Sequence, residues 1–391
     1  MKKWLTYLLI FASCTLNTVA MGQTVQTKID SLRQVLKSTR ADTSKIKLYN
    51  EIIKCYRKAG NSKMMIEYSM TSLGLCSKEK YPSYYEKANG NIWTALNDSG
   101  VAFYEISNYP SALDMYVKAI PYAILSNNEI NLGYAYSNIG NVYKRQKNFI
   151  KAYEYYIKSA EIRKKINEKR TLSICYNNLG HIFKDIPDAE CSQIGINPEE
   201  KLNQAKTYYT MALEASSSIN ETNGIAASYA SLANLYYQQQ KYPVAMEMAK
   251  ASLMASMNTD NDKFIAAAHN KIAQILLNQS KEDFIAKKTA FESKDSIISQ
   301  HLTEALKWAD ASGDLSTKMQ VYESLAQYCN EVNKYQEAYA YHRKFKQCSD
   351  SIYNSENAGK MSDIITMYEA QKKQIEIDLL TKDKKLQAAV L

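Results

Sequence analysis

Asparagine and glutamine recur at helical spacing in this chain, often with a lysine or histidine one turn further along. Ser137, Asn141 and Lys144 follow the i, i+4, i+7 pattern that places three side chains on one face of a helix. An amide carries both a hydrogen-bond donor and an acceptor, so a row of amides is able to bond the main chain of an extended polypeptide. Asparagine is a mediocre helix former, and a face that is only exposed to solvent, with no binding role, would favour Glu, Lys or Ala. The pattern therefore indicates a polypeptide-binding surface; the alternative is that some of these amides bond only neighbouring helices.

Motifs for catalysis and for metal binding are absent from the sequence. The four histidines, at positions 181, 269, 301 and 342, are scattered, and none belongs to an H-E-x-x-H pattern. The chain contains no Walker loop, no G-x-S-x-G and no kinase signature. The sequence thus predicts a protein that is not an enzyme and that needs no cofactor and no metal.

Six cysteines follow the N-terminal segment. In an antiparallel helical hairpin, Cys329 lies opposite a point about ten residues before Cys348, which separates the two by on the order of 15 Å at about 1.5 Å per residue. That separation exceeds the roughly 7 Å between Cα atoms that a disulfide tolerates. The same geometry argues against Cys55 with Cys76, whereas a bridge between Cys175 and Cys191 stays open. Small buried thiols are otherwise expected.

The elements that position these residues repeat every forty residues. Gly100, Gly140 and Gly180 are forty apart, and so are Ala233 and Ala273. Around Gly140 the chain reads Tyr136-x2-Ile139-Gly140-x2-Tyr143, followed by Ala152-x3-Tyr156. With 31 tyrosines but only 12 glycines and 6 prolines, the composition favours helix nearly throughout. We expect Gly140 and Ala152 to let two antiparallel helices approach, and the tyrosines to fill the space between neighbouring pairs.

This pattern resembles the tetratricopeptide repeat, whose first helix carries aromatic-x2-Leu-Gly-x2-Tyr and whose second carries Ala-x3-aromatic. The resemblance covers residues 45–352, about seven helical pairs. It implies an all-α fold, a right-handed α-solenoid, in which the first helices line a concave groove that binds a protein or peptide. Residues 23–44, with Ile29, Leu32 and Leu36 at helical spacing, are expected to form a capping helix.

Aligning the repeats assigns specific residues to the expected groove. These are Asn97, Asn138, Asn141, Lys144, Asn177, Asn178, His181, Lys184, Asn234, Tyr237, Asn270 and Gln274. Lys144 and Lys184 would favour an acidic partner.

Two repeats are interrupted by insertions. Thirteen extra residues between Phe183 and Ala205 include Pro187, Gly195 and Pro198, which predicts a loop. Twenty extra residues between Leu276 and Ala305 contain neither Pro nor Gly, which predicts lengthened helices.

The formal net charge is +9, and residues 144–170 hold ten Lys or Arg against three Glu. The run divides between two turns at opposite edges of the expected array, so it forms no single patch. Solvated helix ends are the simplest interpretation, and an anionic surface partner is the alternative. No nucleic-acid partner is expected.

Residues 1–22 read as a signal peptide. Lys2 and Lys3 precede a short apolar run, and Ala20-Met21-Gly22 is a small-x-small cleavage site. Export to the periplasm or cell envelope is therefore expected. The alternative is lipoprotein processing at Cys14, which would make the protein an envelope-associated structural or assembly lipoprotein.

Residues 353–391 predict a long helix with coiled-coil character, since apolar residues recur there at alternating steps of four and three. A homodimer through this helix is one expectation. The segment looks like the helix that follows the repeats in exported tetratricopeptide sensor proteins of bacteria, which implies a sensory or scaffold role in signal transduction. In that family a membrane span and an output domain follow; the sequence has no membrane span, and whether one follows Leu391 stays open. The ligand is not identified by any of these features.

Overall fold

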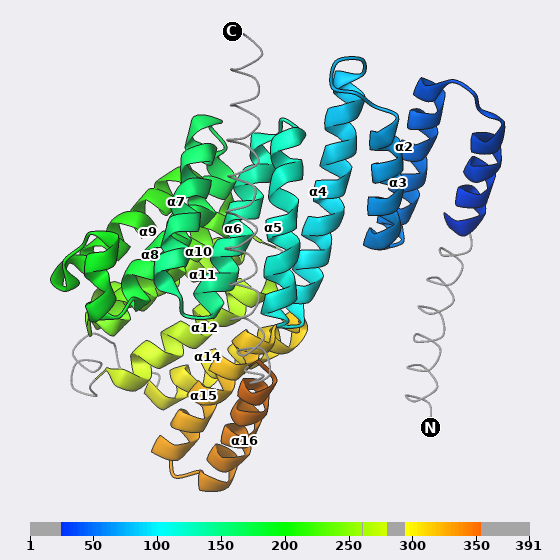
Figure 1. Cartoon of the computed structure of the whole chain (residues 1–391). Coiled ribbons are helices and arrows are strands. Elements are labelled where there is room, and N and C mark those ends of the chain that lie inside the picture. Colours follow the sequence, from blue (N-terminus) through cyan, green and yellow to red (C-terminus); the bar gives the residue numbers. More distant parts are fainter. Residues whose placement is uncertain (1–24, 260, 280–293, 353–391) are drawn as a thin grey trace, which may run out of the picture. The chain divides into compact units, whose positions relative to one another are not determined.

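The protein folds into antiparallel helical hairpins that pack one after another, with no strand among the residues that the structure describes (Figure 1). The computed structural model describes residues 25–259, 261–279 and 294–352. The described part of the chain divides into two compact units: an N-terminal unit that ends at Asn138 and a C-terminal unit that begins at Ile139. The predicted all-α solenoid of helical hairpins is confirmed. The predicted signal peptide and C-terminal helix lie outside the described residues.

The N-terminal unit begins with a helix over residues 25–38. It continues with α2 (Asp42–Lys58), α3 (Ser62–Gly74), α4 (Pro82–Glu105), α5 (Tyr109–Leu125) and the first part of α6 (Glu129–Arg145). Ile29 is buried, and Leu32 and Leu36 pack beside it on a core that includes Ile52 and Met65. The first helix thus covers apolar side chains of α2 and α3.

The C-terminal unit continues from α6 through the remaining hairpins, drawn from green to orange in Figure 1. Its helices are α7 (Phe149–Lys165), α8 (Lys169–Asp185), α9 (Lys201–Ser217), α10 (Thr222–Gln238), α11 (Tyr242–Ser256), α12 (Asp262–Asn278), α14 (Lys294–Ser312), α15 (Leu315–Glu331) and α16 (Tyr335–Ile352). The first helices of successive hairpins also touch one another, since α8 packs on α10, α10 on α12 and α12 on α15. We call α6, α8, α10, α12 and α15 the inner helices, and their partners α7, α9, α11, α14 and α16 the outer helices.

Several turns inside the hairpins share one design of three residues; the connection between α8 and α9 is longer. The middle residue takes a left-handed conformation, as Ser107 (φ 61°) and Lys147 (φ 59°) do. In two of these turns the third residue caps the next helix, since the side chains of Asn108 and Asn148 accept hydrogen bonds from Ser111 N and Lys151 N, whereas Lys241 before α11 makes no such bond. These turns reverse the chain and set each hairpin antiparallel.

Glycines at forty-residue spacing make room for tyrosines of the outer helices. A Cβ atom on Gly140 would lie 2.8 Å from Cε1 of Tyr156. Gly100 and Gly180 face Tyr116 and Tyr209 in the same way. The atoms that a Cβ on Gly140 would approach most closely thus belong to the Tyr156 ring, within its own hairpin, and not to Ala152, against which Gly140 was expected to lie. Where alanine replaces this glycine, at positions 233 and 273, alanines 249 and 309 take the tyrosine position and pack in the same core.

The two insertions differ in outcome. The first is a loop, as predicted, made of the short 3₁₀ helices η1 (Asp188–Ile194) and η2 (Pro198–Glu200). Its Cys191 is buried, and Ile194 and Ile196 pack against the core around Phe183. At the second insertion α12 has 17 residues, like α8 and α10, so the prediction of lengthened helices is wrong for α12. Residues 280–293 lie outside the described part.

Candidate functional site: the inner helices

In the N-terminal unit, the two predicted groove residues bond each other, and a second pair of asparagines repeats the contact. The Asn138 amide donates to Oδ1 of Asn97 over 2.9 Å, joining α6 to α4. One hairpin earlier, Asn91 donates to Oδ1 of Asn50 over 3.0 Å, joining α4 to α2. Both pairs are 41 residues apart, which is close to the repeat length.

In the C-terminal unit, several predicted groove amides also link neighbouring inner helices. Asn177, which is 8% exposed, donates to Ser228 Oγ on α10 over 2.9 Å. Gln274 donates to Ser324 Oγ on α15 over 2.9 Å. Asn270 is only 2% exposed. Asn177 and Asn270 thus lie mainly between helices; binding of a ligand by the predicted groove amides stays a prediction.

A second group of side chains remains partly exposed on what we call the inner face. It consists of Asn141, Lys144, Asn178, His181, Lys184, Asn234, Tyr237, Lys271 and Gln274. Two outer-helix tyrosines reach it: Tyr156 donates from its hydroxyl to Asn141 Oδ1 over 2.7 Å, and the Tyr209 hydroxyl lies 2.8 Å from His181 Nδ1.

Lysines dominate the charge of the inner face. Lys144 donates to Oδ1 of Asn178 over 2.6 Å. Lys271 donates to Oε1 of Gln274, and its Nζ lies 4.4 Å from the centre of the Tyr237 ring. Lys184 pairs with its neighbour Asp185 over 2.8 Å. Tyr237 also accepts a hydrogen bond from Asn278 over 2.7 Å.

Burial penalises positive charge on this face. It lowers the pKa of Lys144 to about 8; Arg145 and Lys184 act in the same direction and Asp185 opposes them. Burial also lowers the pKa of Lys271 to about 8, and Lys184 again adds to the effect while Glu323 opposes it. Both side chains are partly exposed, so it is the packing around their ammonium groups that removes water.

His181 lies among these lysines as a neutral ring. Burial, followed by repulsion from Lys144 and Lys184, holds its pKa well below the ordinary value of 6.5. The face therefore combines ammonium groups with neutral amides, and it is suited to a ligand that brings negative charge.

Lys271 was missed by sequence reasoning, although a signal was present. It aligns with Asn138 and Asn178, since each of the three precedes an Ile or Leu that is followed by Gly or Ala. This position of the repeat was assigned to the groove only in the third and fourth repeats, where it is Asn138 and Asn178. The side chain of Asn234 is partly exposed, and no hydrogen bond joins it to another described residue.

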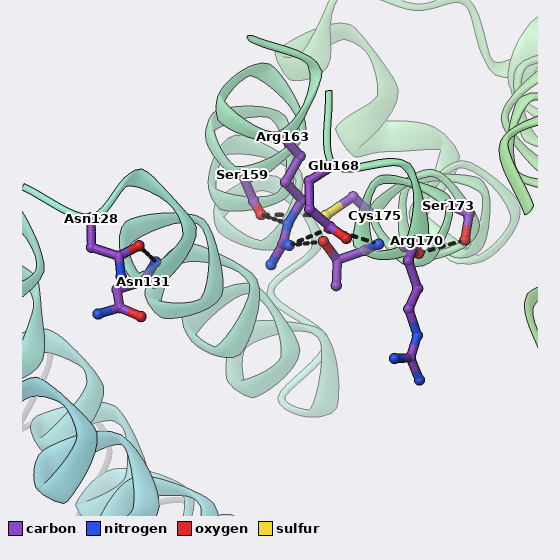
Figure 2. A network of polar contacts seen from close by, with 9 residues as sticks. Asn128, Asn131, Ser159, Arg163, Glu168, Arg170, Ser173 and Cys175 are labelled. Atoms are coloured by element: carbon purple, nitrogen blue, oxygen red, sulfur yellow. Dashed lines mark hydrogen bonds and ion pairs between the residues drawn. The ribbon is translucent and has the colours of Figure 1, made fainter. Parts of the chain in front are cut away.

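The prediction that the basic run consists of solvated helix ends is wrong at Arg163. This side chain is 1% exposed and donates to Ser159 Oγ over 3.0 Å and to Thr171. It also lies 3.4 Å from a carboxylate oxygen of Glu168, which caps α8 (Figure 2). Arg163 thus ties the end of α7 to the start of α8.

Two of the histidines that look scattered in the sequence come together. Nδ1 of His269 on α12 lies 2.8 Å from Nδ1 of His301 on α14. Within the described ranges, no group of three or more His, Cys, Asp or Glu is arranged to hold a metal ion. The six cysteines of the described ranges are free thiols, all buried. None of the described helices has the length and hydropathy needed to cross a bilayer.

Comparisons with known proteins agree with this architecture. A family model described as tetratricopeptide repeat matches residues 132–170 and 225–253. No curated protein matches the chain. Among solved structures, aspartyl phosphate phosphatase F from Bacillus subtilis is similar at a TM-score of 0.50 with 13% identity, over 85% of this chain and 96% of that one.

Two further solved structures have TM-scores just below 0.50. A Rap protein complexed with competence and sporulation factor has a TM-score of 0.46 with 15% identity, over 86% of this chain and 99% of that one. The apo form of RapI has a TM-score of 0.49 with 12% identity, over 74% and 98%. The tetratricopeptide-repeat fold that the family model indicates generally serves as a non-catalytic scaffold for binding proteins.

Proposed function

Because the chain is a tetratricopeptide-repeat protein, we propose that it binds an extended acidic polypeptide segment on its inner face. The observation that supports this most directly is the gathering of Lys144, Lys184 and Lys271 from three different inner helices. Removing ammonium groups from water is costly unless an opposite charge compensates. On this face, the carboxylates near the lysines are Asp185, which pairs with Lys184, and Glu323 on α15.

An acidic segment would supply the missing compensation. Its carboxylates would accept charge-assisted hydrogen bonds from the ammonium groups, and these are stronger than neutral ones. Asn141, Asn178 and Asn234 would contribute further donors along the segment. A cationic face also accelerates the encounter with an acidic partner.

The experiment compares two triple variants in binding to a fluorescent hexaglutamate peptide. The first replaces Lys144, Lys184 and Lys271 with alanine. The matched control replaces Lys164, Lys169 and Arg170, which are exposed at the turn between α7 and α8, and removes the same charge.

At roughly tenfold for each lost charge pair, the first variant should bind at least about 100-fold more weakly than the wild-type protein. The control should bind nearly as well as wild type. Equal losses in both variants would mean that only net charge matters, and would contradict the proposal.

We further propose that the protein is exported and acts as the sensory or scaffold part of a signalling system. This rests on residues 1–22 and 353–391 alone, by their sequence. The lipoprotein alternative makes a different prediction for the mature N-terminus. Mass spectrometry of protein from its native envelope should find Gln23 as the first residue; an acylated Cys14 would favour the anchored form instead.

A further inference from the structure

Two tyrosines of the outer helices reach through the hairpin and touch the inner face. The ring of Tyr156 lies on Gly140, and its hydroxyl donates to Oδ1 of Asn141, the next residue. Tyr209 lies on Gly180 in the same way, and its hydroxyl contacts Nδ1 of His181. Tyr156 and Tyr209 are both 0% exposed. In each case the missing Cβ of glycine opens the path by which a phenol reaches the inner face.

These contacts decide which hydrogen-bonding groups are left for a ligand. Asn141 uses its carbonyl oxygen on Tyr156, so its amide NH₂ is the group that it can offer. His181 is a neutral ring, and a neutral imidazole has one donor and one acceptor nitrogen. If the phenol donates to Nδ1, the proton of the ring lies on Nε2, and His181 becomes a donor as well.

Other acceptors on the inner face are used in the same manner. Oδ1 of Asn178 accepts from Lys144, and Oε1 of Gln274 accepts from Lys271. The groups that remain are the amide nitrogens of Asn141 and Asn178, the ammonium groups, and the side chain of Asn234, which keeps both a donor and an acceptor. Apart from Asn234, the inner face of the C-terminal unit therefore presents donors, because the oxygens of its other amides already accept bonds within the protein.

We propose that Tyr156 and Tyr209 are positioning residues that give this face its donor polarity and so select a ligand rich in carboxylate oxygens. The inference rests on the proposed function and narrows it. An amide that pairs with a peptide main chain needs both its donor and its acceptor, whereas Asn141 and His181 are held as donors. A carboxylate, which only accepts, fits such a surface better than a main-chain or side-chain amide does.

The chain contains a natural control for this idea. Tyr116 lies on Gly100 as the other two tyrosines lie on their glycines, and it is 2% exposed. The residue after Gly100 is Val101, which has no polar atom in its side chain to receive the hydroxyl. Replacing Tyr116 with phenylalanine should therefore change the packing no more than the same replacement of Tyr156 or Tyr209 does. It should leave the hydrogen-bonding groups of the inner face unchanged.

The test compares Y156F, Y209F and Y116F in binding to hexaglutamate and to hexaglutamine, which has the same backbone but carries amides. Loss of one orienting hydrogen bond should weaken hexaglutamate binding by about fivefold in Y156F and in Y209F. The ratio of the affinities for hexaglutamate and hexaglutamine should become smaller in both variants. Y116F should show the same affinities as the wild-type protein. If Y156F and Y209F are folded and discriminate as well as Y116F does, the inference is overturned.

A second measurement needs no ligand. In the ¹⁵N spectrum of histidine side chains, His181 of the wild-type protein should show an unprotonated Nδ1 and a protonated Nε2, and Y209F should lose this preference. A proton on Nδ1 in the wild-type protein would overturn the inference even if hexaglutamate binds. Failure of the wild-type protein to bind hexaglutamate would instead overturn the proposed function, while the histidine spectrum would still decide what Tyr209 does.

Discussion

Replacing Gly140 with alanine tests whether the repeated glycine exists to admit a tyrosine. A Cβ atom at this position would lie 2.8 Å from Cε1 and 2.9 Å from Cδ1 of Tyr156. Both atoms belong to a buried aromatic ring, which cannot move aside easily. Overpacking of this kind costs about 1–3 kcal/mol, and displacing the ring also weakens its hydrogen bond to Asn141, which is worth about 1 kcal/mol.

Alanine has an opposing benefit, since it is favoured over glycine in a helix interior by about 1 kcal/mol. The terms sum to a net destabilisation of about 1–3 kcal/mol for G140A. Y156A alone should cost about 3–5 kcal/mol, because it leaves a large cavity. Once the ring is gone, however, the added methyl group meets empty space. G140A should therefore stabilise the Y156A protein by about 1 kcal/mol. The same substitution thus destabilises the wild-type protein and stabilises the Y156A variant.

Gly90 provides the matched control. It lies within α4, and a Cβ atom there would approach nothing closer than the Cβ of Ser126, at an ordinary 3.8 Å. G90A should thus be neutral or stabilising by up to about 1 kcal/mol.

The assay is urea unfolding followed by circular dichroism, fitted with a nearest-neighbour repeat model because long arrays need not unfold in one step. If G140A is as stable as G90A, the packing argument is refuted.

Three other predictions follow from buried charge. Affinity for hexaglutamate should fall as pH rises from 7 to 9, because Lys144 and Lys271, each with a pKa of about 8, lose their protons in the free protein. Fluorescence titrations across this range measure the affinity. An affinity that does not change with pH would contradict a role of these two ammonium groups in binding. Stability should fall as pH drops below about 6.5, since unfolded histidine binds protons there while burial lowers the pKa of His181 and His269 in the folded protein. Urea midpoints at pH 7.5 and 5.5 test this, and a midpoint that does not fall would count against neutral rings. Replacing Arg163 with alanine should cost about 1–3 kcal/mol, because Ser159 and Thr171 would lose the buried group that donates to them, while Glu168, whose side chain is 29% exposed, would still be partly solvated. A loss below about 1 kcal/mol in urea unfolding would show that the network is not important for stability.

Much of the fold is predictable from the sequence because a short-range pattern decides it. The forty-residue spacing of Gly100, Gly140 and Gly180 specifies hairpins that stack, and Pro187 and Gly195 mark the loop. What a small residue faces is harder to predict. Gly140 could meet either Ala152 or Tyr156, four residues apart on one face of α7, and only the approach of the two helices decides between them.

The candidate site was predictable in part. Lys144 and Lys184 follow the helical spacing of the inner face, but Lys271 differs in type from Asn138 and Asn178 in the same column. Its importance appears only when α8 and α12 bring it near Lys184. Arg163 was misjudged for a related reason: a charged residue at a helix end is normally solvated, and its partners Ser159 and Thr171 have no pattern that marks them beforehand.

The most direct test of the account is to locate a bound acidic peptide on the protein. A hexaglutamate peptide with a photoreactive benzophenone can be crosslinked at pH 7 and its attachment points mapped by mass spectrometry. If the inner face binds the peptide, attachment should occur on inner helices of the C-terminal unit, α8, α10 and α12, and should be lost when Lys144, Lys184 and Lys271 are replaced. Attachment mainly to the outer helices α7, α9 and α11, or labelling that survives loss of the three lysines, would contradict it.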